Sequence, residues 1–140
     1  MASLIYDSAL YDEARGNINY LSDSFKVILV TSTYVPNKGT HLKRSDVTNE
    51  VVGTGYVAGG QAATVAVGAV DTTNHRVDVS LGGTTWSTAT ITARGAVYYK
   101  SRGGAATADE LIAYIDFGAD ITSTGANFAL TASTLRKSNP

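Results

Sequence analysis

Apolar and polar residues alternate with a period of two over much of the chain, and β-branched residues occupy many of the alternating positions. This pattern is typical of strands that bury one face. We count about eight such runs, separated by turn-forming residues such as Gly, Asp and Asn. Short alternating strands joined by turns predict an all-β fold, namely a jelly-roll or Greek-key β-sandwich.

The strongest run spans residues 25–33, in which both faces are apolar. It is predicted to be a central strand that is covered on both sides. Farther along, Gly82 and Gly83 separate the alternating run 76–81 from the run 85–93. Because a glycine pair supplies the positive φ angles of a two-residue turn, these runs are predicted to form an antiparallel hairpin.

Helical signals are few. Asp7 or Ser8 is suited to cap a short helix over residues 9–15, with Gly16 just past its end. Further strands are expected at 51–56, 61–70, 94–99, 111–117 and 127–135.

The chain of 140 residues has the size of a single domain. We expect an N-terminal arm over residues 1–20, a sandwich over 21–135 and a mobile tail over 136–140, which has nothing apolar to bury. Removing residues 2–20 is expected to leave a folded domain without its arm.

Composition adds one feature to this picture: only 16% of the residues are charged, which is low for a free surface. Part of the surface is therefore expected to be covered by partners. A net charge of -1 with scattered basic residues argues against nucleic-acid binding. No run approaches the roughly 18 apolar residues that span a membrane. The absence of cysteine fits synthesis in a reducing cytosol.

Candidate catalytic groups are scarce. His41 and His75 are the only histidines, and both lie in predicted loops beside basic residues, so we interpret them as surface residues. The adjacent acids at 12–13 and 109–110 cannot converge on one reacting atom and are interpreted as surface or capping charges. No calcium-loop or zinc-ligand spacing is present. We therefore expect no catalytic, cofactor-binding or metal-ligating residues, and no enzymatic activity.

Two segments are candidates for contact with a partner. Tyr6, Tyr11 and Tyr20 lie in a polar N-terminal segment, and tyrosine rings are favoured at protein interfaces. Alternatively, these rings pack over one end of the protein's own sandwich. The second candidate is the loop 34–46, whose positive charge is suited to an acidic partner, with simple solvation as the alternative. Its basic side chains are Lys38, His41, Lys43 and Arg44.

Three long segments carry a resemblance to a known family. They are LYDEARGNINYLSDSFKVILVTSTYVPNKGTHLKRSDV (10–47), TWSTATITARGAVYYKSRGG (85–104) and ADELIAYIDFGADITSTGANFALTAS (108–133). From Ser3 to Leu135, the chain resembles the cement, or decoration, proteins of tailed-bacteriophage heads, in particular those of short-tailed phages.

The resemblance implies a jelly-roll protein that is made in the host cytoplasm and becomes part of the virion. Such a protein binds the outer surface of the capsid and ties together neighbouring major capsid protein subunits of the HK97 type. It implies a homodimer, with a trimer as second choice, and neither cofactor nor catalytic residue.

The alternative is a receptor- or glycan-binding β-sandwich domain of a phage tail. Jelly-roll sandwiches are common lectin scaffolds, and rings such as Trp86, Tyr98 and Tyr99 are suited to stack on sugars if they are exposed. Burial of Trp86 in the core is the competing interpretation, because it lies in an alternating strand.

Overall fold

The alternating segments form eight strands in the computed structural model, which describes residues 2–139. Met1 and Pro140, at the ends of the predicted arm and tail, lie outside the described residues. The strands are β1 (Leu4–Ile5), β2 (Phe25–Val30), β3 (Gln61–Ala63), β4 (Val65–Val67), β5 (Arg76–Leu81), β6 (Thr84–Lys100), β7 (Leu111–Leu130) and β8 (Ser133–Ser138). The helices are α1 (Asp7–Ala14) and the single-turn 3-10 helices η1 (Arg44–Asp46) and η2 (Ala106–Ala108).

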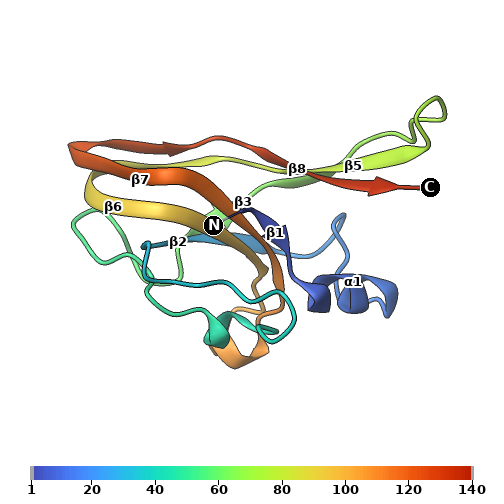
Figure 1. The fold of residues 1–140 in the computed structure, drawn as a ribbon, viewed down its shortest axis with the longest axis horizontal. Helices are drawn as coiled ribbons and strands as arrows, with labels where there is room; N and C mark the ends of the chain where they lie inside the picture. Colours follow the sequence, from blue (N-terminus) through green and yellow to red (C-terminus); the bar gives the residue numbers. More distant parts are fainter. Residues whose placement is uncertain (1, 140) are drawn as a thin grey trace.

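The strands build two antiparallel sheets, which confirms the predicted all-β sandwich with a short N-terminal helix (Figure 1). The five-stranded sheet has the order β1-β7-β6-β2-β3. The three-stranded sheet, β4-β5-β8, extends beyond the body of the molecule and is called the projecting sheet below (Figure 1).

The fold is built on a long ribbon of β6 and β7. Their pairing runs from Thr84 opposite Leu130 to Tyr99 opposite Leu111. The sequence predicted separate shorter strands here. The strands stay continuous because register shifts interrupt the ladder without ending it, as β-bulges do.

The predicted central strand is confirmed. β2 pairs with both β6 and β3, and five of its six residues are buried. Phe25, Val27 and Leu29 pack in a core between the two sheets, together with the buried Trp86. The other face of β2, with Ile28 and Val30, packs in a second, tyrosine-rich core beneath the five-stranded sheet.

The predicted hairpin at Gly82 and Gly83 is wrong. β5 pairs with β4 and β8, whereas β6 lies in the other sheet, so the glycine pair carries the chain from one sheet to the other. Neither residue has a positive φ angle. A Cβ atom on Gly82 would lie 2.5 Å from the carbonyl oxygen of Thr64, and one on Gly83 would collide with that of Leu130. The glycines therefore permit a close approach of backbones.

Three other strand predictions are modified. The segment 127–135 divides after Leu130 between β7 and β8, which lie in different sheets. The segment 51–56 does not form a strand: Thr54 makes an isolated bridge with Thr90, and the Val51 N–H donates to Leu29 O of β2 at 2.9 Å. The segment 61–70 divides at Thr64, so that β3 lies in one sheet and β4 in the other.

The segments near both ends of the described residues 2–139 are tied to the fold. Gly16, with φ 81°, follows α1 as predicted. The predicted cap by Asp7 or Ser8 is wrong, because α1 already begins at Asp7 and its N-cap residue, Tyr6, makes no side-chain capping bond. β8 continues to Ser138, so residues 136–138 of the predicted tail belong to the projecting sheet. Lys137 Nζ lies 2.6 Å from Glu13 Oε1.

Candidate interaction surface

The predicted N-terminal arm is an integral part of the domain. β1 pairs with β7, and the Tyr6 N–H donates to Ile112 O at 3.1 Å. Tyr6 and Ala9 are fully buried, and Ile18 is nearly so. The first twenty residues therefore complete the two cores.

Of the three predicted contact tyrosines, only Tyr11 presents its ring to solvent, with 63% of the residue exposed. The Arg15 guanidinium lies 5.0 Å from the centre of that ring. Tyr6 is buried, and Tyr20 is half-buried and stacked on Phe25 at 5.6 Å. Tyr6 and Tyr20 therefore pack on the protein's own sandwich, which was the alternative interpretation of these rings.

A chain of hydrogen bonds holds the loop 34–46 to the N-terminal segment. Tyr6 Oη lies 2.8 Å from Tyr34 Oη, which lies 2.8 Å from His41 Nδ1. The Asn37 N–H also donates to His41 Nδ1, at 3.2 Å. His41 Nδ1 is therefore the acceptor of this network, Tyr34 donates to it and Tyr6 donates to Tyr34. Burial, the largest cause, raises the pKa of Tyr34 to about 12, which keeps this donor protonated.

Lys43 and Arg44, predicted to meet an acidic partner, are paired inside the protein. Arg44 Nε lies 2.8 Å from Asp109 Oδ2, and its guanidinium lies 5.0 Å from the ring centre of Tyr99. Lys43 Nζ lies 3.6 Å from Glu110 Oε2. Their charges are therefore compensated, and Lys38 is the most exposed of the predicted basic residues.

The interpretation of Asp109 and Glu110 as surface charges is wrong, because each is only 1% exposed. Consecutive side chains of an extended segment point to opposite sides. Asp109 therefore meets Arg44, while Glu110 accepts hydrogen bonds from Arg102 Nε at 2.8 Å and from Arg102 Nη2 at 2.6 Å. The two acids clamp the loops that contain η1 and η2.

This clamp should weaken in acid. Burial alone would raise the pKa of Glu110, but the Arg102 hydrogen bonds and the Lys43 charge hold this pKa below its ordinary value of 4.5. A depressed pKa contributes stability above the unfolded-state value, and that stability is lost as pH falls.

We expect Glu110→Gln to reduce the loss of unfolding free energy below pH 4.5, measured by urea denaturation across pH. The control, Asp120→Asn at an exposed acid, removes the same charge without touching the clamp. Equal slopes for wild type and Glu110→Gln would contradict the assignment.

A broad uncharged surface lies at the end of the molecule where β6 and β7 bend near their middles, at the left in Figure 1. It is built from parts of three segments, 51–70, 79–93 and 121–135, none of which contains a charged residue. The parts of these segments in β4, β5 and β8 belong to the projecting sheet instead. The pairing of β6 with β7 joins the last two segments. A bridge between Thr54 and Thr90 adds the first. We call this surface the charge-free end.

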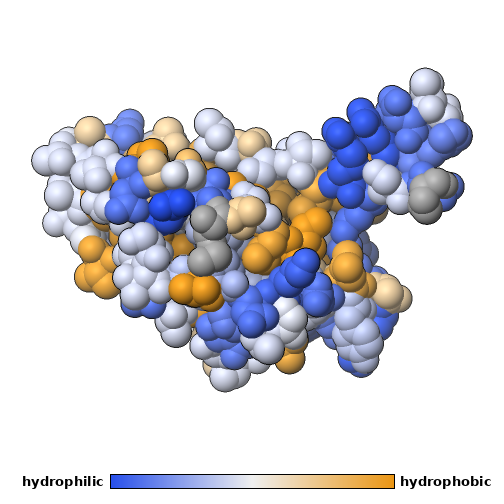
Figure 2. All heavy atoms as spheres, in the orientation of Figure 1, coloured by the Kyte–Doolittle hydropathy of each residue, from blue (hydrophilic) through white to orange (hydrophobic). Residues whose placement is uncertain are grey.

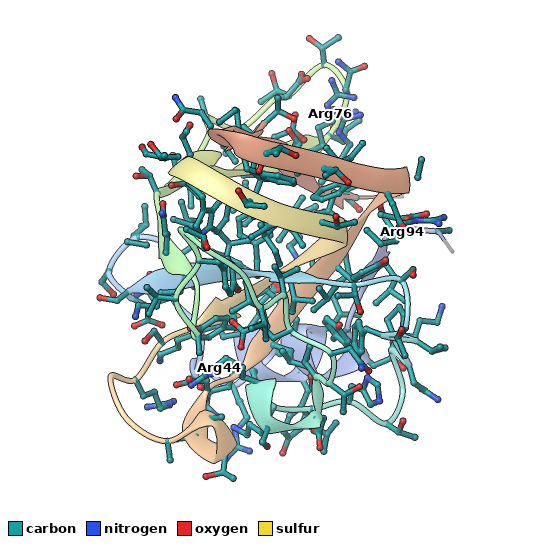
Figure 3. All side chains as sticks on the ribbon, turned by 90° about the vertical axis from the view of Figure 1, so that its left-hand side faces the viewer. Arg44, Arg76 and Arg94 are labelled. Atoms are coloured by element: carbon teal, nitrogen blue, oxygen red, sulfur yellow. The ribbon has the colours of Figure 1, made fainter. Side chains whose placement is uncertain are left out.

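The figures show how charge is distributed around this end. In Figure 2 the left side of the molecule is mostly pale, whereas the blue side chains gather chiefly on the projecting sheet. Figure 3 looks onto the charge-free end and places Arg44, Arg76 and Arg94 around its margin. The scattered arginines agree with the absence of a basic field.

Apolar side chains are exposed on the charge-free end. Val52 is 94% exposed, Val57 75% and Ile121 45%. Beside Val52 lies a shallow hollow of about 330 Å³, lined largely by threonines. Because the segments that form this surface contain no charged residue, a partner that covers them should remove little charge from water. Its contacts should depend little on salt.

The rings that suggested sugar stacking are in the core. Trp86 is 1% exposed, Tyr98 0% and Tyr99 1%. Trp86 packs edge-on against Phe128, with ring centres 6.2 Å apart. The interpretation of Trp86 as a core residue is confirmed, and these three rings offer no stacking surface.

Within residues 2–139, no group of three or more His, Asp and Glu side chains is arranged to hold a metal ion. In the same part of the chain, no helix has the length and apolar character needed to cross a membrane. Comparisons with family models, with curated proteins and with solved structures gave no match.

Proposed function

We propose that this protein is a structural component of a phage particle, where it binds the outer surface of the capsid and cements neighbouring major capsid protein subunits. The resemblance of residues 3–135 to cement proteins supports this proposal. The structural observation that carries it is the charge-free end, where Val52 and Val57 are exposed in a segment without charged residues. The preceding acid, Glu50, is held by hydrogen bonds from Tyr56 Oη and the Gly59 N–H. A free surface normally carries far more charge.

The proposed role requires neither a catalytic residue nor a cofactor. A cement protein contacts several subunits that the shell already holds in place, so each further contact forms at high effective concentration. Many weak contacts then suffice. The charge-free end offers broad neutral contacts, and the edges of the projecting sheet offer unpaired backbone groups. The partners are a major capsid protein of the HK97 type and a second copy of this chain, with a trimer as second choice.

Copy number tests the proposal directly. In purified virions of the phage or prophage that encodes this chain, we expect hundreds of copies per particle. Quantitative mass spectrometry against the major capsid protein measures this ratio. A few copies per particle would instead indicate a tail protein, and absence from the particle would contradict any structural role in the virion.

A single charge tests the contact surface. We expect Val52→Glu to weaken binding to capsids that lack the protein by at least about tenfold, because covering an uncompensated charge is costly. Folding should be unchanged, since Val52 is 94% exposed. The readout is the occupancy after purified protein is added back to such capsids.

The matched control for this test is Leu21→Glu, at a residue that is 80% exposed and outside the three uncharged segments. It should bind as wild type does. Normal binding of Val52→Glu would remove the charge-free end from the interface.

A further inference from the structure

β4 is an edge strand of the projecting sheet, and half of its backbone groups point away from β5. The even-numbered residues of 64–68 face β5: the Gly82 N–H donates to Thr64 O at 2.7 Å, and the Gly68 N–H donates to Asp78 O at 2.9 Å. Because hydrogen bonding alternates along an antiparallel strand, the N–H and C=O groups of Val65 and Val67 point outward. These groups lie at the free edge of the sheet.

Apart from the shortness of β4, which has three residues, this edge lacks the devices that normally prevent pairing with another chain. Natural edge strands are blunted by charged residues, proline or bulges. β4 lies within the charge-free segment 51–70, which also contains no proline. Ala66 is exposed and Val67 is 37% exposed. The opposite edge of the same sheet, β8, carries Arg136 and Lys137 and is protected in this way.

We propose that β4 pairs antiparallel with β4 of a second copy, across a two-fold axis at Ala66. The inference rests on the self-association contained in the proposed function and specifies where it occurs. In this register Val65 lies opposite the partner's Val67, and each such pair exchanges both of its backbone hydrogen bonds. Two projecting sheets then become one continuous sheet.

The properties of β4 favour a second copy of this chain as the partner at its free edge. It has no charge that a different partner would need to match, and its outward backbone groups are arranged symmetrically about Ala66. Val65 and Val67 lie opposite Leu81 and Val79 of β5, so they share a face with those apolar residues. Two-fold pairing extends this apolar row across the axis, as in an isologous interface. Pairing through β8 would bring like charges together.

The first test removes one outward hydrogen-bond donor. We expect the wild-type chain to have twice the monomer mass of 14.6 kDa in light scattering coupled to size-exclusion chromatography. Val67→Pro should be monomeric, because proline removes the outward N–H and its ring blocks the edge. The bonds between β4 and β5 do not use this N–H, so folding should be retained.

Arg136→Pro is the matched control on the other edge. The Asn139 N–H donates to His75 O at 2.8 Å, so the Arg136 N–H points outward from β8. The variant also breaks the exposed ion pair with Asp78, which contributes little. We expect this variant to remain a dimer.

The second test uses charge at the axis. Ala66 faces the partner's Ala66 directly, so we expect Ala66→Arg and Ala66→Glu each to weaken the dimer at least several-fold. Mixing the two variants should restore a dimer that contains one copy of each, which a folding defect would not allow. Ser80→Arg, one strand inward on the same face, should leave the dimer intact.

A monomeric or trimeric wild-type chain across a concentration series would overturn the inference, as would a dimer that survives in Val67→Pro and Ala66→Arg. The solution mass is independent of capsid occupancy. A monomeric chain found in hundreds of copies on capsids would remove this inference alone, and a dimer absent from virions would remove only the proposed function.

Discussion

A chain that lacks residues 2–20 is expected to be unfolded in water. The deletion removes Tyr6 and Ile18 from the two cores, together with the buried Ala9, and it leaves Tyr34 Oη without its buried partner Tyr6. Truncating one buried aromatic residue typically costs about 3–5 kcal/mol. The whole domain is stabilised by only about 5–15 kcal/mol. Loss of several buried groups therefore exceeds what the remaining sheets supply.

Circular dichroism and urea denaturation measure this outcome. The matched control is the double substitution Leu10→Ser with Tyr11→Ala, whose residues are 53% and 63% exposed on the same segment. It should unfold cooperatively with nearly wild-type stability. A cooperative transition in the deleted chain would show that the N-terminal segment is a separable arm after all.

Gly60→Ala should be the most damaging single substitution in the charge-free end. Gly60 has φ 74°, and a Cβ atom there would collide with the carbonyl oxygen of Val27 on β2. The neighbouring Gly59 O accepts a hydrogen bond of 2.6 Å from the buried Tyr99 Oη, so the loop cannot move away without losing it. We expect a loss of about 4 kcal/mol or more in unfolding free energy, measured in urea.

Gly16→Ala is the control variant, because it introduces backbone strain without a collision. Gly16 has φ 81°, and a Cβ atom there would have nothing within 4 Å. The substitution should cost only about 1–2 kcal/mol, the ordinary price of a left-handed conformation. Equal losses for the two variants would mean that the contact with Val27 does not restrain the loop that bears Val52 and Val57.

Strand identity was predictable from the sequence, whereas strand pairing was not. The alternation of Val77, Val79 and Leu81 is a local pattern that any sheet would require, so β5 was found. The choice of neighbours depends on distant residues. Gly82 and Gly83 have the composition of a hairpin turn, but the same glycines also allow two backbones to approach closely, and the sequence does not distinguish these uses.

The candidate surface was predictable only in part. Low charge correctly indicated that some surface differs from an ordinary one, and each charge-free run is visible in the sequence. Their assembly at one end depends on the β6–β7 ladder and on the bridge from Thr54. Asp109 and Glu110 were misjudged because acids are usually solvated. Only the fold brings Lys43 and Arg44 against them.

The pairing of β1 with β7 and of β5 with β8 also constrains how the chain folds during synthesis. β1 can pair with β7 only after Tyr114, the partner of Leu4, has been synthesised. β5 can complete its pairing with β8 only after Ser138 has been synthesised. While the ribosome is still translating, β5 has only the short β4 beside it. Topologies dominated by such distant pairings fold slowly, in milliseconds to seconds. The apolar strands made early therefore remain accessible to other nascent chains until residue 138 has left the ribosome.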